Sequence, residues 1–306
     1  MRYSGIGGQA VMEGVMMKNK DRYAVAVRKP DQEIVVEVKD YTGIIKNEKV
    51  KNIPILRGVL NFIDSLVLGI STLTYSASFF EEEESNRKKQ LDEKQKKKKE
   101  NAEMGITVAL SFVLAIAIFM ILPYYLSLFF RKYIASPTLL ALIEGVIRLV
   151  IFVVYILLIS RMEDIQRTFM YHGAEHKCIN CIEHGLELNV ENVRKSSRQH
   201  KRCGTSFLLY VLVLSILFFA FIRVDNRALR LLLRVVLIPV IAGVSYEFIR
   251  LAGRSENKLV MALSKPGLWL QKLTTKEPDD AMIEVGIASV EAVFDWRSFQ
   301  KDVEEQ

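Results

Sequence analysis

Residues His172 to His176 form the pattern H-x-x-E-H, which could bind a divalent metal ion. Two histidines spaced i and i+4 lie on one face of an α-helix, so their ring nitrogens can converge on one ion. In this inverted form of the zinc-protease helix, both histidines bind the metal and the glutamate polarises a metal-bound water. The pattern therefore predicts His172 and His176 as metal ligands and Glu175 as a general base.

Further candidate ligands surround this pattern, because all four histidines and all three cysteines of the chain fall within residues 172–203. A third ligand could come from His200 or Cys203 in this stretch, or from the carboxylates of Glu247 and Glu13 elsewhere. Three protein ligands and one open position for water are typical of catalytic zinc sites. The expected cofactor is a divalent metal, with zinc as the expected ion.

A different metal site can be built from the same stretch. Cys178-x-x-Cys181 followed by His200-x-x-Cys203 has the spacing of a structural zinc finger. A closed site of that kind does no chemistry, and the protein would then be a membrane scaffold that docks a cytoplasmic partner. In the first arrangement, by contrast, Cys178 and Cys181 are ordinary small residues. The sequence leaves both arrangements open.

Composition and charge indicate a membrane protein with basic soluble parts. The chain has 306 residues, of which 50% are hydrophobic, and a formal net charge of +7. Soluble globular proteins seldom combine these properties. Three clustered cysteines and no cleavable signal peptide favour the reducing side of a membrane over a disulfide framework. We find no Walker or dinucleotide loop and no serine or cysteine nucleophile motif, and we expect no specific nucleic-acid partner.

Four apolar stretches are near or above the roughly 20 residues with which a helix crosses hydrocarbon. They are residues 106–130, 138–160, 205–222 and 228–249. We therefore predict transmembrane helices 1 and 2 within 106–160, and helices 3 and 4 within 205–249. Lysine and arginine are concentrated before the first helix and between the second and third, so the positive-inside rule predicts cytoplasmic termini.

The remaining segments are expected to form a small cytoplasmic α+β module beside the membrane. It combines residues 1–53, a metal-site loop at 161–204 and a C-terminal tail at 250–306. Within the first segment, the alternating runs at 23–27 and 34–38 predict a β-hairpin. The expected fold class is thus a mainly α membrane protein, with a four-helix transmembrane bundle and this module.

Two segments before the first transmembrane helix have a different character. Residues 54–80 are apolar but carry polar residues at helical spacing, which predicts an amphipathic helix on the membrane surface rather than a span. Residues 81–105 contain four glutamates and then a lysine-rich run, so we expect a disordered, solvated linker. Its basic end would contact the anionic headgroups of the lipid bilayer.

The second apolar stretch contains two opposite charges, Glu144 and Arg148, at i and i+4. This spacing predicts an ion pair that faces the inside of the helix bundle, because lipid does not solvate either charge. Together with Glu247, the pair raises the further hypothesis of a transporter.

Six motifs spread along the chain carry a family resemblance. They are GGQAVMEGVMM at 7–17, RGV at 57–59, YHGAEHK at 171–177, RCGTSF at 202–207, SYEFIRLA at 245–252 and TTKEPDD at 274–280. As a set they resemble the YqhQ family of uncharacterised bacterial membrane proteins, whose members are described as predicted metal-dependent enzymes. The resemblance implies a multi-pass protein of the bacterial inner (cell) membrane.

The resemblance also bears on the choice of ligands. The positions that match the family motif are His172, Glu175, His176, His200 and Cys203, whereas cysteine is not required at 178 or 181. We therefore expect an integral membrane metal-dependent hydrolase at the cytoplasmic membrane surface, acting on a membrane-proximal peptide, ester or amide. The alternative remains a non-enzymatic scaffold with a structural zinc loop.

Overall fold

The computed structural model describes residues 3–44, 53–85, 93–222, 224 and 227–304. The chain divides into two compact units, which we describe separately. The first unit comprises Met1–Phe80, Leu158–Val211 and Ile238–Gln306, and the second comprises Glu81–Leu157 and Leu212–Leu237. Every residue proposed above as a metal ligand or general base belongs to the first unit.

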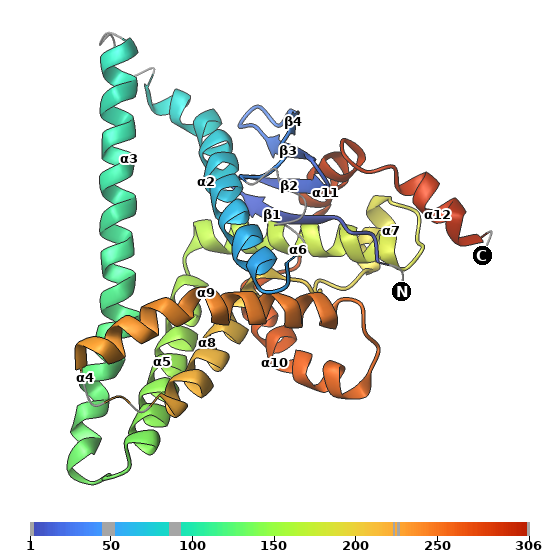
Figure 1. Cartoon of the computed structure of the whole chain (residues 1–306). Coiled ribbons are helices and arrows are strands. Elements are labelled where there is room, and N and C mark those ends of the chain that lie inside the picture. The colour runs from blue at the N-terminus through green and yellow to red at the C-terminus, as the bar shows by residue number, and fades with distance from the viewer. Residues whose placement is uncertain (1–2, 45–52, 86–92, 223, 225–226, 305–306) are drawn as a thin grey trace. The chain divides into compact units, whose positions relative to one another are not determined.

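An antiparallel sheet lies at the centre of the first unit (Figure 1). In the described part of the chain its strands are β1 (Gly7–Val11), β2 (Gly14–Asn19), β3 (Arg22–Arg28) and β4 (Ile34–Asp40), paired in sequence order. The hairpin of β3 and β4 confirms the prediction from the alternating runs. The glycine-rich segment before it supplies β1 and β2, for which we had no strand prediction.

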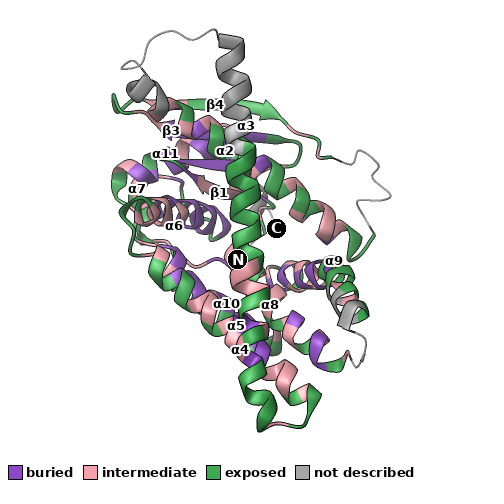
Figure 2. Ribbon diagram, turned by 90° about the vertical axis from the view of Figure 1, so that its left-hand side faces the viewer, coloured by how far each residue is buried: buried purple, intermediate pink, exposed green. Residues whose placement is uncertain are grey.

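Helices cover both faces of this sheet. On one face, Val15 and Met17 of β2 share a core with Ile179 of α6 (Glu163–Glu183) and Ile283 of α11 (Asp280–Glu291). On the other face, Val25 of β3 packs with residues of α2 (Leu56–Ser85). Figure 2 shows that α6 is among the most buried helices of the chain. The sheet and α11 thus remove α6 from solvent.

The helix α2 turns its polar side toward the sheet. Asp64 accepts a hydrogen bond from Tyr41 at 3.1 Å, and Thr72 accepts one from Gln9 at 2.8 Å. The outward side is apolar, and its side chains are between 42% and 52% exposed; they are Ile63, Leu66, Val67, Ile70 and Leu73. The helix is amphipathic, as its sequence predicts, and Asp64 and Thr72 have partners within the protein, whereas Ser65 and Ser71 are exposed.

The other helices complete the two units. In chain order they are α3 (Glu93–Ile116), η1 (Ala117–Ile121), α4 (Leu122–Leu128), η2 (Phe129–Lys132), α5 (Pro137–Ile159), α7 (Val190–Lys195), α8 (Gly204–Phe221), α9 (Arg227–Ala252), α10 (Lys258–Thr274) and α12 (Trp296–Glu304). The long helices α8 and α9 contribute residues to both units.

Five helical segments in the described part of the chain are long and apolar enough to cross a membrane, which indicates a multi-pass membrane protein. They are Leu56–Phe80, Gly105–Lys132, Pro137–Ile159, Gly204–Phe221 and Val235–Ala252. The expected count of four is inexact, because the polar residues of α2 do not lower its hydropathy enough to exclude it. The mainly helical fold with a small sheet agrees with the expected class.

The charged segment 81–105 differs from the expected linker. The helix α2 continues to Ser85 and α3 begins at Glu93, so the described parts of this segment are helical. Lysine, glutamate, glutamine and alanine are strong helix formers and can extend an apolar helix beyond its apolar part. Residues 86–92 of the expected linker lie outside the described residues.

The predicted ion pair is present inside the second unit. Arg148 Nη2 donates to Glu144 Oε1 at 2.9 Å, and Arg148 Nε donates to the carbonyl oxygen of Phe119 at 2.9 Å. The two side chains are only 9% and 6% exposed. Both charges therefore have a partner away from the surface of the unit.

This pair leads to a stability prediction. Arg148→Leu should lower the free energy of unfolding by about 3–5 kcal/mol, because it leaves the Glu144 carboxylate buried without its cation. The double change Glu144→Leu with Arg148→Leu removes both charges and should lose less. Thermal unfolding of the detergent-purified variants would measure this order. Equal stabilities of the single and the double variant would show that the pair does not hold the unit together.

Candidate metal site

The helix α6 places the H-x-x-E-H pattern in the interior of the first unit. Its residues from Tyr171 to Glu183 are buried, apart from the half-buried His172. The rings of His172 and His176 lie one helical turn apart, with centroids separated by 4.4 Å. The two imidazoles thus share one face of the helix, as their spacing predicts.

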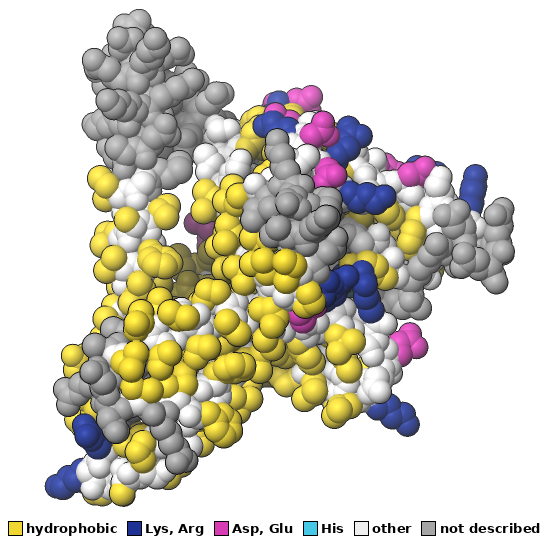
Figure 3. All heavy atoms as spheres, in the orientation of Figure 1, with side chains coloured by type: hydrophobic (Ala, Val, Ile, Leu, Met, Phe, Trp, Pro, Cys, Tyr) yellow, Lys and Arg dark blue, Asp and Glu magenta, His cyan; other side chains and the backbone are white. Residues whose placement is uncertain are grey.

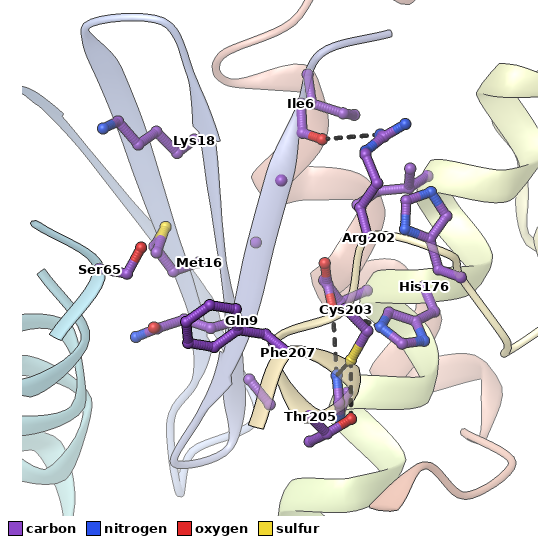
Figure 4. A pocket seen from close by; sticks show the side chains of 18 of the residues that line it. Ile6, Gln9, Met16, Lys18, Ser65, His176, Arg202, Cys203, Thr205 and Phe207 are labelled. Carbon is purple, nitrogen blue, oxygen red and sulfur yellow. Dashed lines mark hydrogen bonds and ion pairs between the residues drawn. The ribbon is translucent and has the colours of Figure 1, made fainter. Parts of the chain in front are cut away.

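Cys203, directly before α8, completes a group of three. Its Sγ lies 3.3 Å from Nε2 of His172. Within the described residues, the ligand atoms of His172, His176 and Cys203 all lie within 4.8 Å of one another. Figure 4 shows His176 and Cys203 next to each other, with Thr205 beyond the sulfur. Two imidazole nitrogens and one sulfur are suitable donors for zinc.

Backbone carbonyls orient both imidazoles. Nδ1 of His172 lies 2.9 Å from the carbonyl oxygen of Thr274, and Nδ1 of His176 lies 2.6 Å from that of Arg198. A carbonyl oxygen can only accept a hydrogen bond, so we assign the proton to Nδ1 in each ring. Each Nε2 then faces the site as a potential metal ligand, where Nε2 of His172 contacts Sγ of Cys203, and metal-binding histidines are commonly held in this way.

The charges in this group favour a cation beside the sulfur. Burial opposes a charge on His172, but the attraction of Cys203 and their hydrogen bond raise its pKa to about 9. Burial also opposes a thiolate, yet the two histidines lower the pKa of Cys203 well below its usual value. A thiolate is therefore favoured when a positive charge lies next to it, and a metal ion can supply that charge.

Glu175 lies on the edge of the group rather than within it. Its Oε2 is 3.6 Å from Nε2 of His176 and 3.8 Å from Nε2 of His172. Burial raises the pKa of this carboxyl, although both histidines and a hydrogen bond from the Gly8 amide act in the opposite direction. The position suits a base that receives a proton from a water held between the three ligands.

Two glycines allow backbone segments to approach α6 at the site. A Cβ on Gly8 of β1 would lie 2.5 Å from the carbonyl oxygen of Met16 and 2.9 Å from Cγ of Glu175. A Cβ on Gly173 would lie 2.0 Å from the carbonyl oxygen of Lys276, in the segment that brings Thr274 to His172. We did not predict roles for these two positions, although the motifs at 7–17 and 171–177 contain them.

His200 lies beside the group but is directed away from it. Its Nε2 is 3.4 Å from Oε2 of Glu183, and the other carboxylate oxygen, Oε1, accepts a hydrogen bond from Nη2 of Arg202 at 2.7 Å. Burial disfavours a charge on Glu183, but these two partners lower its pKa to about 2. Burial is also the main reason that the pKa of His200 falls to about 4. The structure thus pairs His200 with Glu183 outside the three-ligand group.

The two other carboxylates considered as ligands have arginine partners. Glu247 accepts a hydrogen bond from Nε of Arg57 at 2.6 Å. Glu13 accepts one from Nε of Arg167 at 2.5 Å. Neither carboxylate belongs to the three-ligand group among the described residues.

Cys178 and Cys181 lie in the core between α6 and its neighbours. Sγ of Cys181 is 3.4 Å from the carbonyl oxygen of Glu187, and a Cβ on Gly286 of α11 would lie 2.9 Å from Sγ of Cys178. Burial raises the pKa of both thiols. In the part of the chain that the structure describes, neither thiol joins a group of potential ligands with His200 and Cys203.

The three-ligand group opens into a cavity of about 800 Å³ in the first unit. Strands β1 and β2, the helices α2 and α6, the start of α8 and part of α9 contribute to its wall. His172, Glu175, His176 and Cys203 all belong to this wall. A reacting group could therefore reach the ligands and Glu175 from the same space.

Comparisons with known proteins identify the family of this chain. Residues 53–296 match the family described as "Protein of unknown function (DUF1385)". The chain is also 37% identical over 286 residues to "Uncharacterized protein YqhQ" of Bacillus subtilis (strain 168), covering 92% of this chain and 90% of that protein. No solved structure matches the chain. The family resemblance drawn from the six motifs is thus confirmed, whereas the description of its members as metal-dependent enzymes is not tested, and the chain belongs to the DUF1385 family.

Proposed function

We propose that the protein is a metal-dependent hydrolase in which zinc is held by His172, His176 and Cys203. The observation that carries this proposal is the convergence of their three ligand atoms within 4.8 Å, with both Nδ1 atoms fixed by carbonyls. Three protein ligands leave a fourth position open, and the cavity provides access to it. That combination is typical of catalytic rather than structural zinc sites.

The side chains of the site suit the hydrolysis of an ester or amide. Zinc, when bound, supplies Lewis-acid activation of water at neutral pH. Glu175 takes a proton from the attacking water, whose oxygen adds to the carbonyl carbon of the substrate. The bond to the leaving oxygen or nitrogen then breaks, and Glu175 returns the proton to that atom. The products are a carboxylic acid and an alcohol or amine.

The scaffold alternative has less support from the positions of the cysteines. It requires Cys178 and Cys181 to bind zinc with His200 and Cys203, yet Cys181 contacts the Glu187 carbonyl and His200 contacts Glu183. A second candidate function, nucleophilic catalysis, is suggested by the contact of Cys203 with His172. A thiolate beside an imidazole could act as a nucleophile without a metal. Metal content separates this candidate from the zinc hydrolase.

The contacts of α2 support a position on the membrane surface for this helix. Thr72 and Ser76, in the second half of the helix, are bonded to β1 and to the turn after it. If α2 crossed the bilayer, the polar backbone of that turn would lie within hydrocarbon, which is unfavourable. We therefore propose that four helices cross the membrane and that residues 1–53, 161–204 and 250–306 face the cytoplasm, where anionic headgroups contact the basic segments.

Metal analysis tests the ligand set. Purified wild-type protein should bind about one zinc ion per chain, and His172→Ala, His176→Ala and Cys203→Ala should each lose it, because three ligands are needed. The matched control is Cys178→Ala with Cys181→Ala, which removes two buried thiols of the same region and should retain zinc. Loss of zinc in this control together with retention in His176→Ala would support the zinc-finger arrangement instead.

A second prediction concerns the role of Glu175. Glu175→Gln should retain zinc and folded yield but lose about 10²- to 10⁴-fold in the hydrolysis of p-nitrophenyl esters, since glutamine cannot accept the proton. Rates are measured on zinc-loaded protein in detergent. The control is Glu187→Gln, an exposed glutamate outside the cavity wall. Wild-type rates in Glu175→Gln would eliminate the proposed base.

The orientation can be tested with single cysteines. All three native cysteines are buried, and the chain without an added cysteine gives the background labelling. Asp31→Cys, in the turn between β3 and β4, should react with an impermeant maleimide only after cells are permeabilised. Tyr133→Cys, which is 80% exposed between η2 and α5, should react in intact cells. Labelling of Asp31→Cys in intact cells would place the first unit outside.

A further inference from the structure

Part of the cavity wall between α2 and α8 is apolar; it is formed by Phe62, Leu66, Phe207 and Leu208, and we call it the slot. Phe207 of α8 follows Cys203 by four residues, about one helical turn. The ring of Phe207 is 5.3 Å from the ring of Phe62 in α2. Both rings belong to the wall of the cavity. In Figure 4, Phe207 and Gln9 lie between Cys203 and Ser65 of α2. The two rings therefore form an apolar part of the cavity wall where α2 and α8 meet, next to the polar side chains of Gln9 and Ser65.

The slot continues to the outside of the molecule. Leu66 follows Phe62 by one turn in α2, and Leu208 follows Phe207 in α8; both line the cavity. The same two leucines are 49% and 46% exposed. A water-filled entrance for a soluble substrate would be expected to present polar side chains. These leucines instead join the cavity wall to the outer surface through apolar atoms.

The surface around this opening is suited to contact with lipid. The outward side of α2 is apolar, and α10 exposes Leu259, Leu263 and Trp269. Figure 3 shows hydrophobic side chains covering much of the area of α2 and α9, whereas charged side chains gather over the strands β3 and β4. Exposed apolar area of this kind is typical of a surface embedded in a bilayer.

Another part of the cavity wall is polar. It contains Lys18 and Lys20, near the turn from β2 to β3, and Asp64 of α2. A molecule that fits the whole cavity would combine a polar headgroup with a long apolar chain. A soluble peptide would leave the slot between α2 and α8 exposed to water, and that arrangement is unfavourable.

We propose that the substrate is a long-chain lipid ester that enters from the bilayer through the slot between α2 and α8. Its acyl chain packs against Phe62, Phe207 and Leu66, and its ester group reaches Cys203 and Glu175 at the inner end. This assignment of a substrate class rests on the hydrolase function proposed above. The binding of the chain, however, depends only on the slot and can be measured without hydrolysis.

The test uses photolabelling of the full-length protein in detergent. The probe is phosphatidylglycerol with a diazirine in a 16-carbon acyl chain, and labelled peptides are identified by mass spectrometry. Peptides that contain Phe62 and Phe207 should be labelled, and excess unlabelled phosphatidylglycerol should remove that label. Leu66→Asp should reduce the competable label by at least about tenfold, because a carboxylate in the slot opposes an acyl chain.

Leu73 provides the matched control, since it lies two turns further along the same side of α2. It is 50% exposed, close to the value for Leu66, but does not line the cavity. Leu73→Asp should therefore keep the competable label. Leu66→Gln and Leu73→Gln form a milder pair in case an aspartate prevents folding.

The outcomes separate the two proposals. His176→Ala should keep the competable label while losing zinc, because the chain does not bind the metal. If lipid binding persists but Glu175→Gln hydrolyses esters as wild type does, the hydrolase proposal is wrong and the proposed binding of an acyl chain in the slot is supported. A label that lipid cannot compete away, or equal losses in Leu66→Asp and Leu73→Asp, would overturn the slot. Displacement of the label by a soluble peptide would also overturn it.

Discussion

The burial of α6 is the constraint on which the rest of the site depends. This helix brings several polar side chains into the interior, and each buried polar group must find a partner or destabilise the fold. Lys177 donates to the carbonyls of Arg194 and Ser196, and Asn180 donates to those of Ser197 and Gln199. The loop after α7 is therefore held against α6 by the polar groups of the helix itself. As a result, the carbonyl of Arg198 reaches His176 and the loop delivers Cys203.

The need to pair buried polar groups also explains why the side chains of the site are oriented before any ligand binds. Carbonyls from the loop and from the last residue of α10, Thr274, fix the two imidazoles, and the amide of Gly8 reaches Glu175. A site whose donors are already oriented loses little conformational entropy when it binds a metal. This preorganisation is consistent with catalysis, in which ligands and base must keep a fixed separation.

The helix α2 forms part of the apolar surface of the first unit. In α2, Thr72 bonds to β1 and Asp64 to Tyr41 after β4, whereas large apolar side chains face outward, so the helix joins a folded module to a surface suited to lipid. The candidate metal site opens into the cavity whose wall includes Phe62 and Leu66 of this helix. Under the proposal of a lipid substrate, this part of the wall is the path from the bilayer to the site.

Local sequence signals predicted the features that depend on spacing along one element. Spacing i, i+4 placed His172 beside His176 and Glu144 beside Arg148, and alternation predicted the β3–β4 hairpin. The apolar stretches predicted a membrane protein, although α2 made their count inexact. Local spacing did not select the third candidate ligand, because four residues were compatible with the sequence. Only tertiary structure brought Cys203 to the histidines and gave His200, Glu247 and Glu13 other partners. Contacts between residues far apart in the chain depend on how whole elements pack, which no local pattern encodes.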